Sequence, residues 1–136
     1  MKHPLVCIAL LVLSGSCLAG VDIIVHPSNA ADINQAMVKK LFTGKAKSFP
    51  GGERAIPIAQ AEGSDVTNEF NKKVVKKSDS QLKAYWSKLV FTGKGTPPKT
   101  VSNNQEVIDL ISKNPNMIGI VAQGSGGDNV KVVQSF

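Results

Sequence analysis

The sequence RAIPIAQAEGSDVT, residues 54–67, joins two different patterns through a glycine. Its first half, Arg54 to Gln60, is short and largely apolar, which predicts a β-strand, and Pro57 indicates a sheet edge or a strand end. Gly63 and Ser64 then precede a helix with an apolar stripe formed by Val66, Phe70 and Val74. A strand that passes through a glycine into a helix is typical of α/β folds.

Similar patterns continue on both sides of this stretch. Upstream, a strand is expected at 21–26, followed by a helix that Asp32 can cap and that ends at Gly44. Downstream, we expect a helix after a capping box at 78–81, a loop at 92–101, a helix capped by Ser102 or Asn103, and strands at 117–122 and 130–133. The predicted fold is α/β, with the order β-α-β-α-α-α-β-β around a mixed, mostly parallel sheet.

The helix after the capping box has the clearest helical period, carried by Leu82, Tyr85, Trp86, Leu89 and Val90. This stripe predicts that Trp86 is largely buried. The tetrapeptide Phe-Thr-Gly-Lys occurs at 42–45 and again at 91–94, each time at the end of a predicted helix. That placement favours shared capping chemistry over an internal duplication.

Residues 1–19 predict a secretory signal peptide. A short basic start precedes an aliphatic run at 5–13, and Cys17 and Ala19 are small residues at −3 and −1 of the expected cleavage site. A lipoprotein would be modified at Cys17 instead, but no leucine stands three positions before it. We therefore expect residues 20–136 to form one periplasmic domain that is not an integral membrane protein. Both cysteines, Cys7 and Cys17, would leave with the signal, so the domain must fold without disulfides.

Several functional classes are not expected. Only His26 remains after cleavage to serve as a catalytic histidine, no paired-histidine metal spacing occurs, and no nucleotide-binding glycine loop is complete. An enzyme, a metal site and an organic cofactor are therefore not expected. Arg54 is the single arginine and aromatic residues make up 5%, which argues against nucleic acid binding. Four lysines, Lys72, Lys73, Lys76 and Lys77, form either a solvated helix face or a field that steers anions.

The turn at 60–67 is the candidate binding element. Backbone N–H groups at a helix N-terminus favour an anion, Gly63 permits close approach, and Ser64 and Thr67 add hydroxyl groups. An ordinary serine N-cap explains the same residues, and the charges of Glu62 and Asp65 oppose an anion.

Taken together, the chain resembles short members of the phosphate-type substrate-binding proteins of ABC importers, within the type II periplasmic binding proteins. The resemblance covers nearly all of the chain after the signal. It rests on residues 24–29 (IVHPSN), 33–45 (INQAMVKKLFTGK), 56–58 (IPI), 62–64 (EGS), 69–70 (EF), 82–97 (LKAYWSKLVFTGKGTP) and 117–121 (MIGIV).

The resemblance implies a single lobe of a two-lobed fold and a small oxyanion, most naturally phosphate, as ligand. Its ligand residues would be Gly63, Ser64, Asp65 and Thr67, with Ser28 and Asn29 on the hinge side. An ABC permease or a membrane sensor would be the partner. Two departures matter: the chain is about half the family's length, and Gln60 and Ala61 stand where the family's oxyanion loop has an arginine. A periplasmic interaction or sensing module that lost its ligand is the alternative.

The signal peptide gives the first testable expectation. The mature protein should begin at Gly20 or Val21, because the small residues precede that point. Intact mass spectrometry of the exported protein measures this directly. A mass that includes a lipid-modified Cys17 would show a lipoprotein instead.

Overall fold

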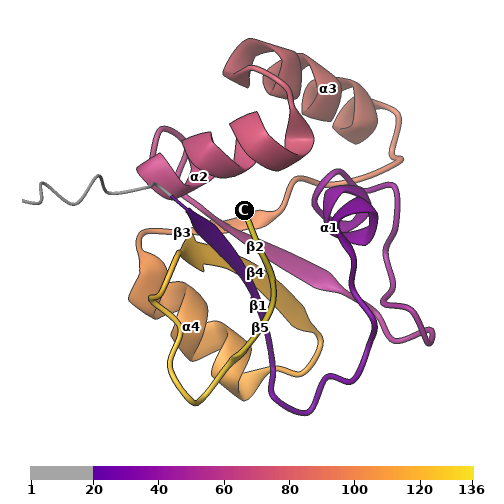
Figure 1. Ribbon diagram of the computed structural model, residues 1–136. Helices are drawn as coiled ribbons and strands as arrows, with labels where there is room; N and C mark the ends of the chain where they lie inside the picture. Colours follow the sequence, from indigo (N-terminus) through magenta and orange to yellow (C-terminus); the bar gives the residue numbers. More distant parts are fainter. Residues whose placement is uncertain (1–19) are drawn as a thin grey trace, which may run out of the picture.

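The computed structural model describes residues 20–136, in which five strands form one sheet with helices on both faces (Figure 1). The predicted signal peptide, residues 1–19, lies outside the described residues. The elements are β1 (Val21–Val25), α1 (Gln35–Phe42), β2 (Ile56–Gln60), α2 (Asp65–Phe70), the π-helical turn η1 (Asn71–Val75), α3 (Asp79–Phe91), β3 (Lys99–Val101), α4 (Asn104–Lys113), β4 (Met117–Ala122) and β5 (Lys131–Ser135).

The sheet has the strand order β3-β2-β4-β1-β5. β2 runs parallel to both β3 and β4, whereas β1 runs antiparallel to both β4 and β5. The predicted α/β class and mixed sheet are therefore confirmed. Fewer strand pairs are parallel than expected. β1 lies between β4 and β5 and is antiparallel to both, so two of the four strand pairs are antiparallel.

One strand and one strand position differ from expectation. Residues 99–101, predicted as loop, form β3 and pair with Ile58 to Gln60. β2 is thus an interior strand rather than an edge strand, and the alternative placement of Pro57 near a strand end is correct. Pro57 is the second residue of β2, and β3 begins to pair only at Ile58, beyond the residue that lacks an N–H group.

The apolar side chains of the sheet divide between its two faces. One core cluster joins Val21, Ile23, Ile118 and Ile120 of the sheet to buried residues of α1, α2 and η1. A second cluster joins the other face to Val107, Ile108 and Ile111 of α4. Figure 1 shows α4 on the opposite side of the sheet from α1 and α2. The fold is therefore a three-layer arrangement in which the period-two pattern of each strand supplies both cores.

Most helix ends follow the predicted chemistry. Ser78 and Gln81 form the expected capping box at α3, and Asn103, rather than Ser102, caps α4. Asp32 does not cap α1: the helix starts later, and the Asn34 side chain accepts the N–H of Met37 at 2.9 Å.

The repeated tetrapeptide ends two helices in the same way. The hydroxyls of Thr43 and Thr92 each donate to the carbonyl four residues earlier, at 2.6 and 2.8 Å. Gly44 and Gly93 follow with φ of 74° and 70°, values that favour glycine. This geometry supports shared capping chemistry.

Most of the Trp86 side chain is buried, as expected, but α3 does not form part of a closed core. No residue of α3 is fully buried, and Val90 and Phe91 are 52% and 93% exposed. Figure 1 shows α3 standing beyond α1 and α2 rather than against the sheet. The helical stripe was identified correctly, but it faces an open cleft instead of a closed core. No helix in residues 20–136 is both long and apolar enough to cross a membrane.

The contact between β4 and α4 yields a stability prediction. A methyl group at Gly119 would lie 2.5 Å from Cγ1 of Val107 and 3.3 Å from Ile111, so Gly119→Ala should destabilise the fold by about 1–3 kcal/mol. Gly127→Ala is the matched control, since its methyl group would meet nothing within 4 Å, and should change stability by less than about 0.5 kcal/mol. Urea unfolding measures both. Equal stability of the two variants would mean that α4 does not pack this closely on β4.

Candidate functional site

The turn from β2 to α2 is built around Gly63 and Ser64. Gly63 has φ of 83°, and a methyl group there would meet no atom within 4 Å, so the backbone is accessible at this point. Ser64 is the N-cap of α2, its Oγ accepting the N–H of Thr67 at 3.3 Å. The Ser64 N–H donates to the carbonyl of Ala61 at 3.1 Å, which closes the turn.

The donors available to a ligand at this turn are few. Among the described residues, the N–H groups of Asp65 and Val66 have no hydrogen-bond acceptor, as is usual for the first turn of a helix. The Thr67 hydroxyl is already committed, since it donates to the carbonyl of Gln60 at 2.8 Å. The Ser64 hydroxyl accepts a bond but keeps its own proton to donate. The turn therefore offers two amides and one hydroxyl.

Charge at the turn is mixed. Asp65 is exposed and begins α2, where it interacts favourably with the helix dipole and competes with an anion. Lys83 of α3 brings a cation near, with its Nζ 3.3 Å from Oε1 of Glu62. The side chain of Gln60, the last residue of β2, donates to Asn104 Oδ1 and to the carbonyl of Ile120, at 2.6 and 3.2 Å.

The structure does not bring Ser28 and Asn29 to this turn. They follow the carboxyl end of β1, which runs antiparallel to β4, whereas Gly63 and Ser64 follow β2, which runs parallel to β4. The two pairs therefore lie at opposite edges of the sheet.

Local contacts use much of the hydrogen-bonding capacity of this distant pair. The Ser28 side chain lies 2.7 Å from Nδ1 of His26, and Asn29 Oδ1 accepts the N–H of Ala31 at 2.9 Å. Asn29 Nδ2 is buried and has no partner among the described residues. These contacts identify a structured turn after β1.

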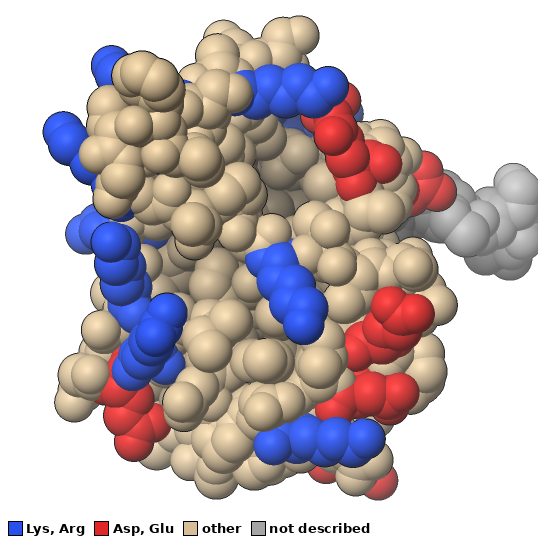
Figure 2. Space-filling model, turned by 180° about the vertical axis from the view of Figure 1, so that it is seen from behind, with Lys and Arg blue, Asp and Glu red and all other residues tan. Residues whose placement is uncertain are grey.

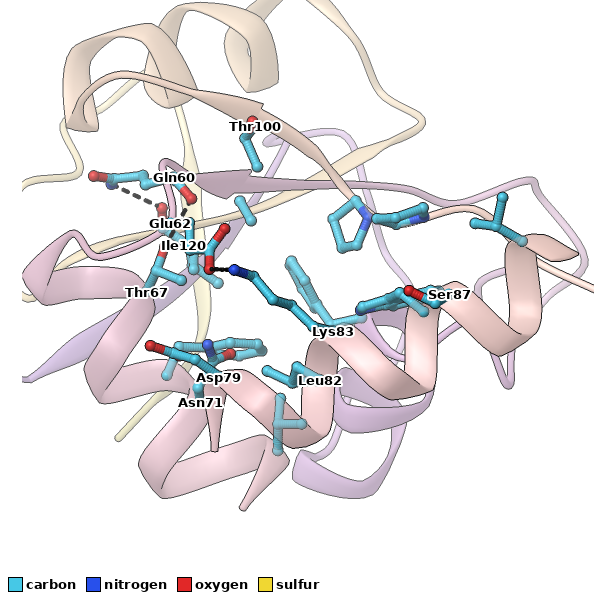
Figure 3. A pocket seen from close by; sticks show the side chains of 18 of the residues that line it. Gln60, Glu62, Thr67, Asn71, Asp79, Leu82, Lys83, Ser87, Thr100 and Ile120 are labelled. Carbon is cyan, nitrogen blue, oxygen red and sulfur yellow. Dashed lines mark hydrogen bonds and ion pairs between the residues drawn. The ribbon is translucent and has the colours of Figure 1, made fainter. Parts of the chain in front are cut away.

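A cleft of about 660 Å³ opens between α3 and the sheet (Figure 3). We call it the α3 cleft. Its floor consists of side chains that are almost completely buried, and its wall is the stripe of α3 that was predicted to be core. The principal apolar residues are Phe42, Phe70, Leu82, Trp86, Pro97 and Ile120.

Polar groups gather mainly at one part of the α3 cleft. Figure 3 shows Lys83 reaching from α3 toward Glu62 of the β2–α2 turn, with Asp79 and Asn71 lower on the same side. The Gly44 and Gly95 loops lie beside the Trp86 ring, since methyl groups there would come within 3.4 and 3.8 Å of it. The apolar stripe of α3 that lines the cleft is visible in the sequence, but its periodicity does not show whether the stripe faces a core or a cleft.

The four lysines after α2 are partly engaged. Lys73 pairs with Glu69 at 3.4 Å, and Lys77 Nζ lies 5.7 Å from the centre of the Tyr85 ring. These contacts are those of a helix surface with local partners. In the described part of the chain, no group of three or more His, Cys, Asp or Glu residues is placed to hold a metal ion.

No family model and no curated protein matches the sequence. The fold nevertheless matches solved structures. A putative phosphate ABC transporter substrate-binding protein with bound phosphate from Clostridium perfringens superposes with a TM-score of 0.67 and 17% identity, over 85% of this chain and 44% of that one. An ABC-type phosphate transport receptor from Vibrio cholerae gives a TM-score of 0.66, 14% identity, and 85% and 46% coverage. PstS from Borrelia burgdorferi gives a TM-score of 0.63 and 15% identity, over 85% of this chain and 47% of that one.

These similarities confirm the expected fold. The chain spans less than half the length of each of the three proteins. At this level of identity the likeness concerns the fold alone.

Proposed function

We propose that the protein is an exported, non-catalytic binding protein for a small oxyanion, with phosphate as the first candidate. The oxyanion would be held by the β2–α2 turn, at Gly63, Ser64, Asp65 and Thr67. Its partner would be an ABC permease or a membrane sensor in the cell envelope. The observation that carries the proposal is the pair of unpartnered amides at Asp65 and Val66, within a fold shared with a phosphate-bound transport protein.

The chemistry of the turn suits a small anion. Two backbone N–H groups and the Ser64 hydroxyl can donate to phosphate oxygens, and the positive end of the helix dipole favours negative charge. Gly63 leaves the approach open, because no side chain stands over its backbone. Thr67 has no free donor of its own, because its hydroxyl donates to the carbonyl of Gln60 and its N–H to Ser64 Oγ, so its role would be to hold the turn in shape.

The same geometry limits the affinity. The turn is exposed, so water continues to solvate one side of a bound anion, and each hydrogen bond contributes less than it would in a closed site. Asp65 and Glu62 add repulsion, while Lys83 is shared with Glu62. We expect phosphate to bind with a Kd on the order of 0.1–10 mM, more weakly as salt increases.

Replacing Asp65 tests the location of this site. Asp65→Asn removes a repulsion of about 1 kcal/mol between the carboxylate and a bound phosphate, so phosphate affinity should rise by about five-fold. Asp128→Asn makes the same change in net charge in the loop before β5, at the opposite edge of the sheet, and should leave the affinity within about two-fold. Phosphate titration of the mature monomer, followed by amide NMR, measures both.

The titration also distinguishes an oxyanion-binding protein from an interaction or sensing module that binds no oxyanion. Shifts confined to residues 63–67, with tighter binding by Asp65→Asn alone, support an oxyanion site at the turn. Equal gains in both variants would show a non-specific charge effect. No shift near Ser64 at tens of millimolar phosphate would contradict oxyanion binding.

A second candidate function is an interaction or sensing module that keeps the fold without transporting a ligand. The observation in its favour is the unburied apolar face of α3, where Phe91 is 93% and Val90 52% exposed. Exposed apolar patches of this kind mark surfaces that contact other molecules. An absence of phosphate shifts would favour this function.

A further inference from the structure

The two loops that contain the repeated Phe-Thr-Gly-Lys segments line one hollow of about 480 Å³. Gly44 comes from the first loop, and Gly93 and Gly95 come from the second. Residues 54–57 also line the hollow, so it lies at the amino end of β2, whereas the β2–α2 turn follows the carboxyl end. We call it the basic hollow. It is separate from the site of the proposed function.

The charged residues in this lining are all basic. They are Lys47, Arg54 and Lys99, and no described Asp or Glu residue lines the hollow. The α3 cleft, in contrast, has two acidic residues in its lining. None of the three basic side chains makes an ion pair or a hydrogen bond with another residue of the described range 20–136. One concave surface thus holds three positive charges without a partner, and such a surface concentrates anions.

The figures show that this hollow lies on the more basic side of the molecule. The 47–55 loop and the start of the connection from α3 to β3 both lie at the right of Figure 1. That side becomes the left margin in the reversed view of Figure 2, where basic side chains gather, while most acidic side chains lie toward the opposite margin. The wider charge distribution therefore also favours an anion at this side.

The backbone around these cations is ordered by its own contacts. Lys47 and Arg54 lie on the two arms of a short antiparallel hairpin, in which the Ala55 N–H donates to the Lys47 carbonyl at 3.0 Å. The Phe49 side chain, 4% exposed, anchors this hairpin in the core. Lys99 is the first residue of β3, which pairs with β2. The lining is therefore formed before a ligand arrives, and binding restricts mainly the three basic side chains.

Helix dipoles explain other lysines nearby, but not these three. α1 and α3 both end beside the hollow, and Lys45 and Lys94 follow their negative ends, where a cation is favoured. The three basic residues of the lining lie outside both helices. Glu53 precedes Arg54 in the hairpin, but it is exposed and is not part of the lining. The inference therefore rests on the three lining cations alone.

We infer that the basic hollow binds a small soluble anion whose charge lies on two or more oxyanion groups, such as a diphosphate. Arg54 is the only arginine of the chain, and its planar guanidinium can donate two N–H bonds to one phosphate or carboxylate group. Lys47 and Lys99 are then available to a second group. An anion with one charged centre meets fewer of these cations, so this ligand class differs from the orthophosphate of the proposed function.

Titration with inorganic pyrophosphate, followed by amide NMR, tests the inference. Each exposed charge contact raises affinity by up to about five-fold, so we expect a Kd on the order of 1–10 mM at low salt, weakening as salt is added. Shifts should appear at residues 44–47, 54–57 and 93–99. Orthophosphate should bind there at least about ten-fold more weakly, and sodium chloride at matched ionic strength should not reproduce the shifts. No shift in these residues at tens of millimolar pyrophosphate would overturn the inference.

Charge-removing variants with a matched control locate the site. Arg54→Gln and Lys99→Gln should each weaken pyrophosphate binding by about five-fold, because each removes one cation from the lining. Lys72→Gln makes the same change in charge at an exposed lysine of η1 that lines a different hollow, and should stay within about two-fold. Thermal unfolding checks that the variants fold. Equal losses in Arg54→Gln and Lys72→Gln would show a general charge effect and contradict the inference.

Vesicles distinguish a soluble ligand from a lipid head group with similar chemistry. Binding to phosphatidylglycerol vesicles but not to phosphatidylcholine vesicles, without any pyrophosphate shift, would overturn the inference and identify a membrane contact instead. Asp65→Asn should leave pyrophosphate binding within about two-fold, and Arg54→Gln should leave the phosphate shifts of residues 63–67 unchanged. The failure of one site is therefore distinguishable from the failure of the other.

Discussion

The pairing of β1 between β4 and β5 is the constraint on which the rest of the structure depends. All five residues of β1 are buried, and the strand closes on the last residue of the chain through two hydrogen bonds between Val21 and Phe136. The buried carboxylate of Asp22 accepts the N–H of Gly124 and the hydroxyl of Ser135, at 2.9 and 2.6 Å. Residues 20–136 contain no cysteine, so apolar burial and hydrogen bonding hold the domain, and the Asp22 carboxylate is one of the buried polar groups whose hydrogen bonds are made.

The direction of β1 also determines which functional residues meet. Because β1 runs opposite to β2 and β4, the turn after β1 lies at one edge of the sheet and the start of α2 at the other. The oxyanion proposal therefore rests on one turn alone. The α3 cleft opens beside that turn, since Glu62 and Thr67 line it as well. One edge of the sheet thus carries both an anion-favouring helix start and an apolar cleft.

Local patterns predicted the elements well. β4 has the predicted bounds, and α3 begins at the predicted capping box, because alternation and capping depend on neighbouring residues. The three residues of β3 carry no such pattern after Pro97 and Pro98, and the strand forms because β2 offers it a free edge. The resemblance implies that Ser28 and Asn29 lie on the hinge side of the site, and the antiparallel direction of β1, which sequence order does not reveal, puts them at the other end of the strands from Ser64. The stripe of α3 predicts that Trp86 is largely buried, but it does not show that the ring lines a cleft, because a helical stripe has the same period whether it faces a core or a cleft.

The central claim is that the sheet around β1 is a stable frame and α3 a separately movable wall. No side chain of α3 is fully buried, and its contacts with the frame include Leu82 against the core, the Tyr85 hydroxyl on the Thr43 carbonyl and the exposed pair of Lys83 with Glu62. Native-state hydrogen exchange tests this most directly. The account predicts that β1 and β4 amides exchange only through global unfolding, and that α3 amides exchange at least about ten-fold faster through local opening. Equal protection of α3 and β1 would contradict it, because α3 would then be part of the frame.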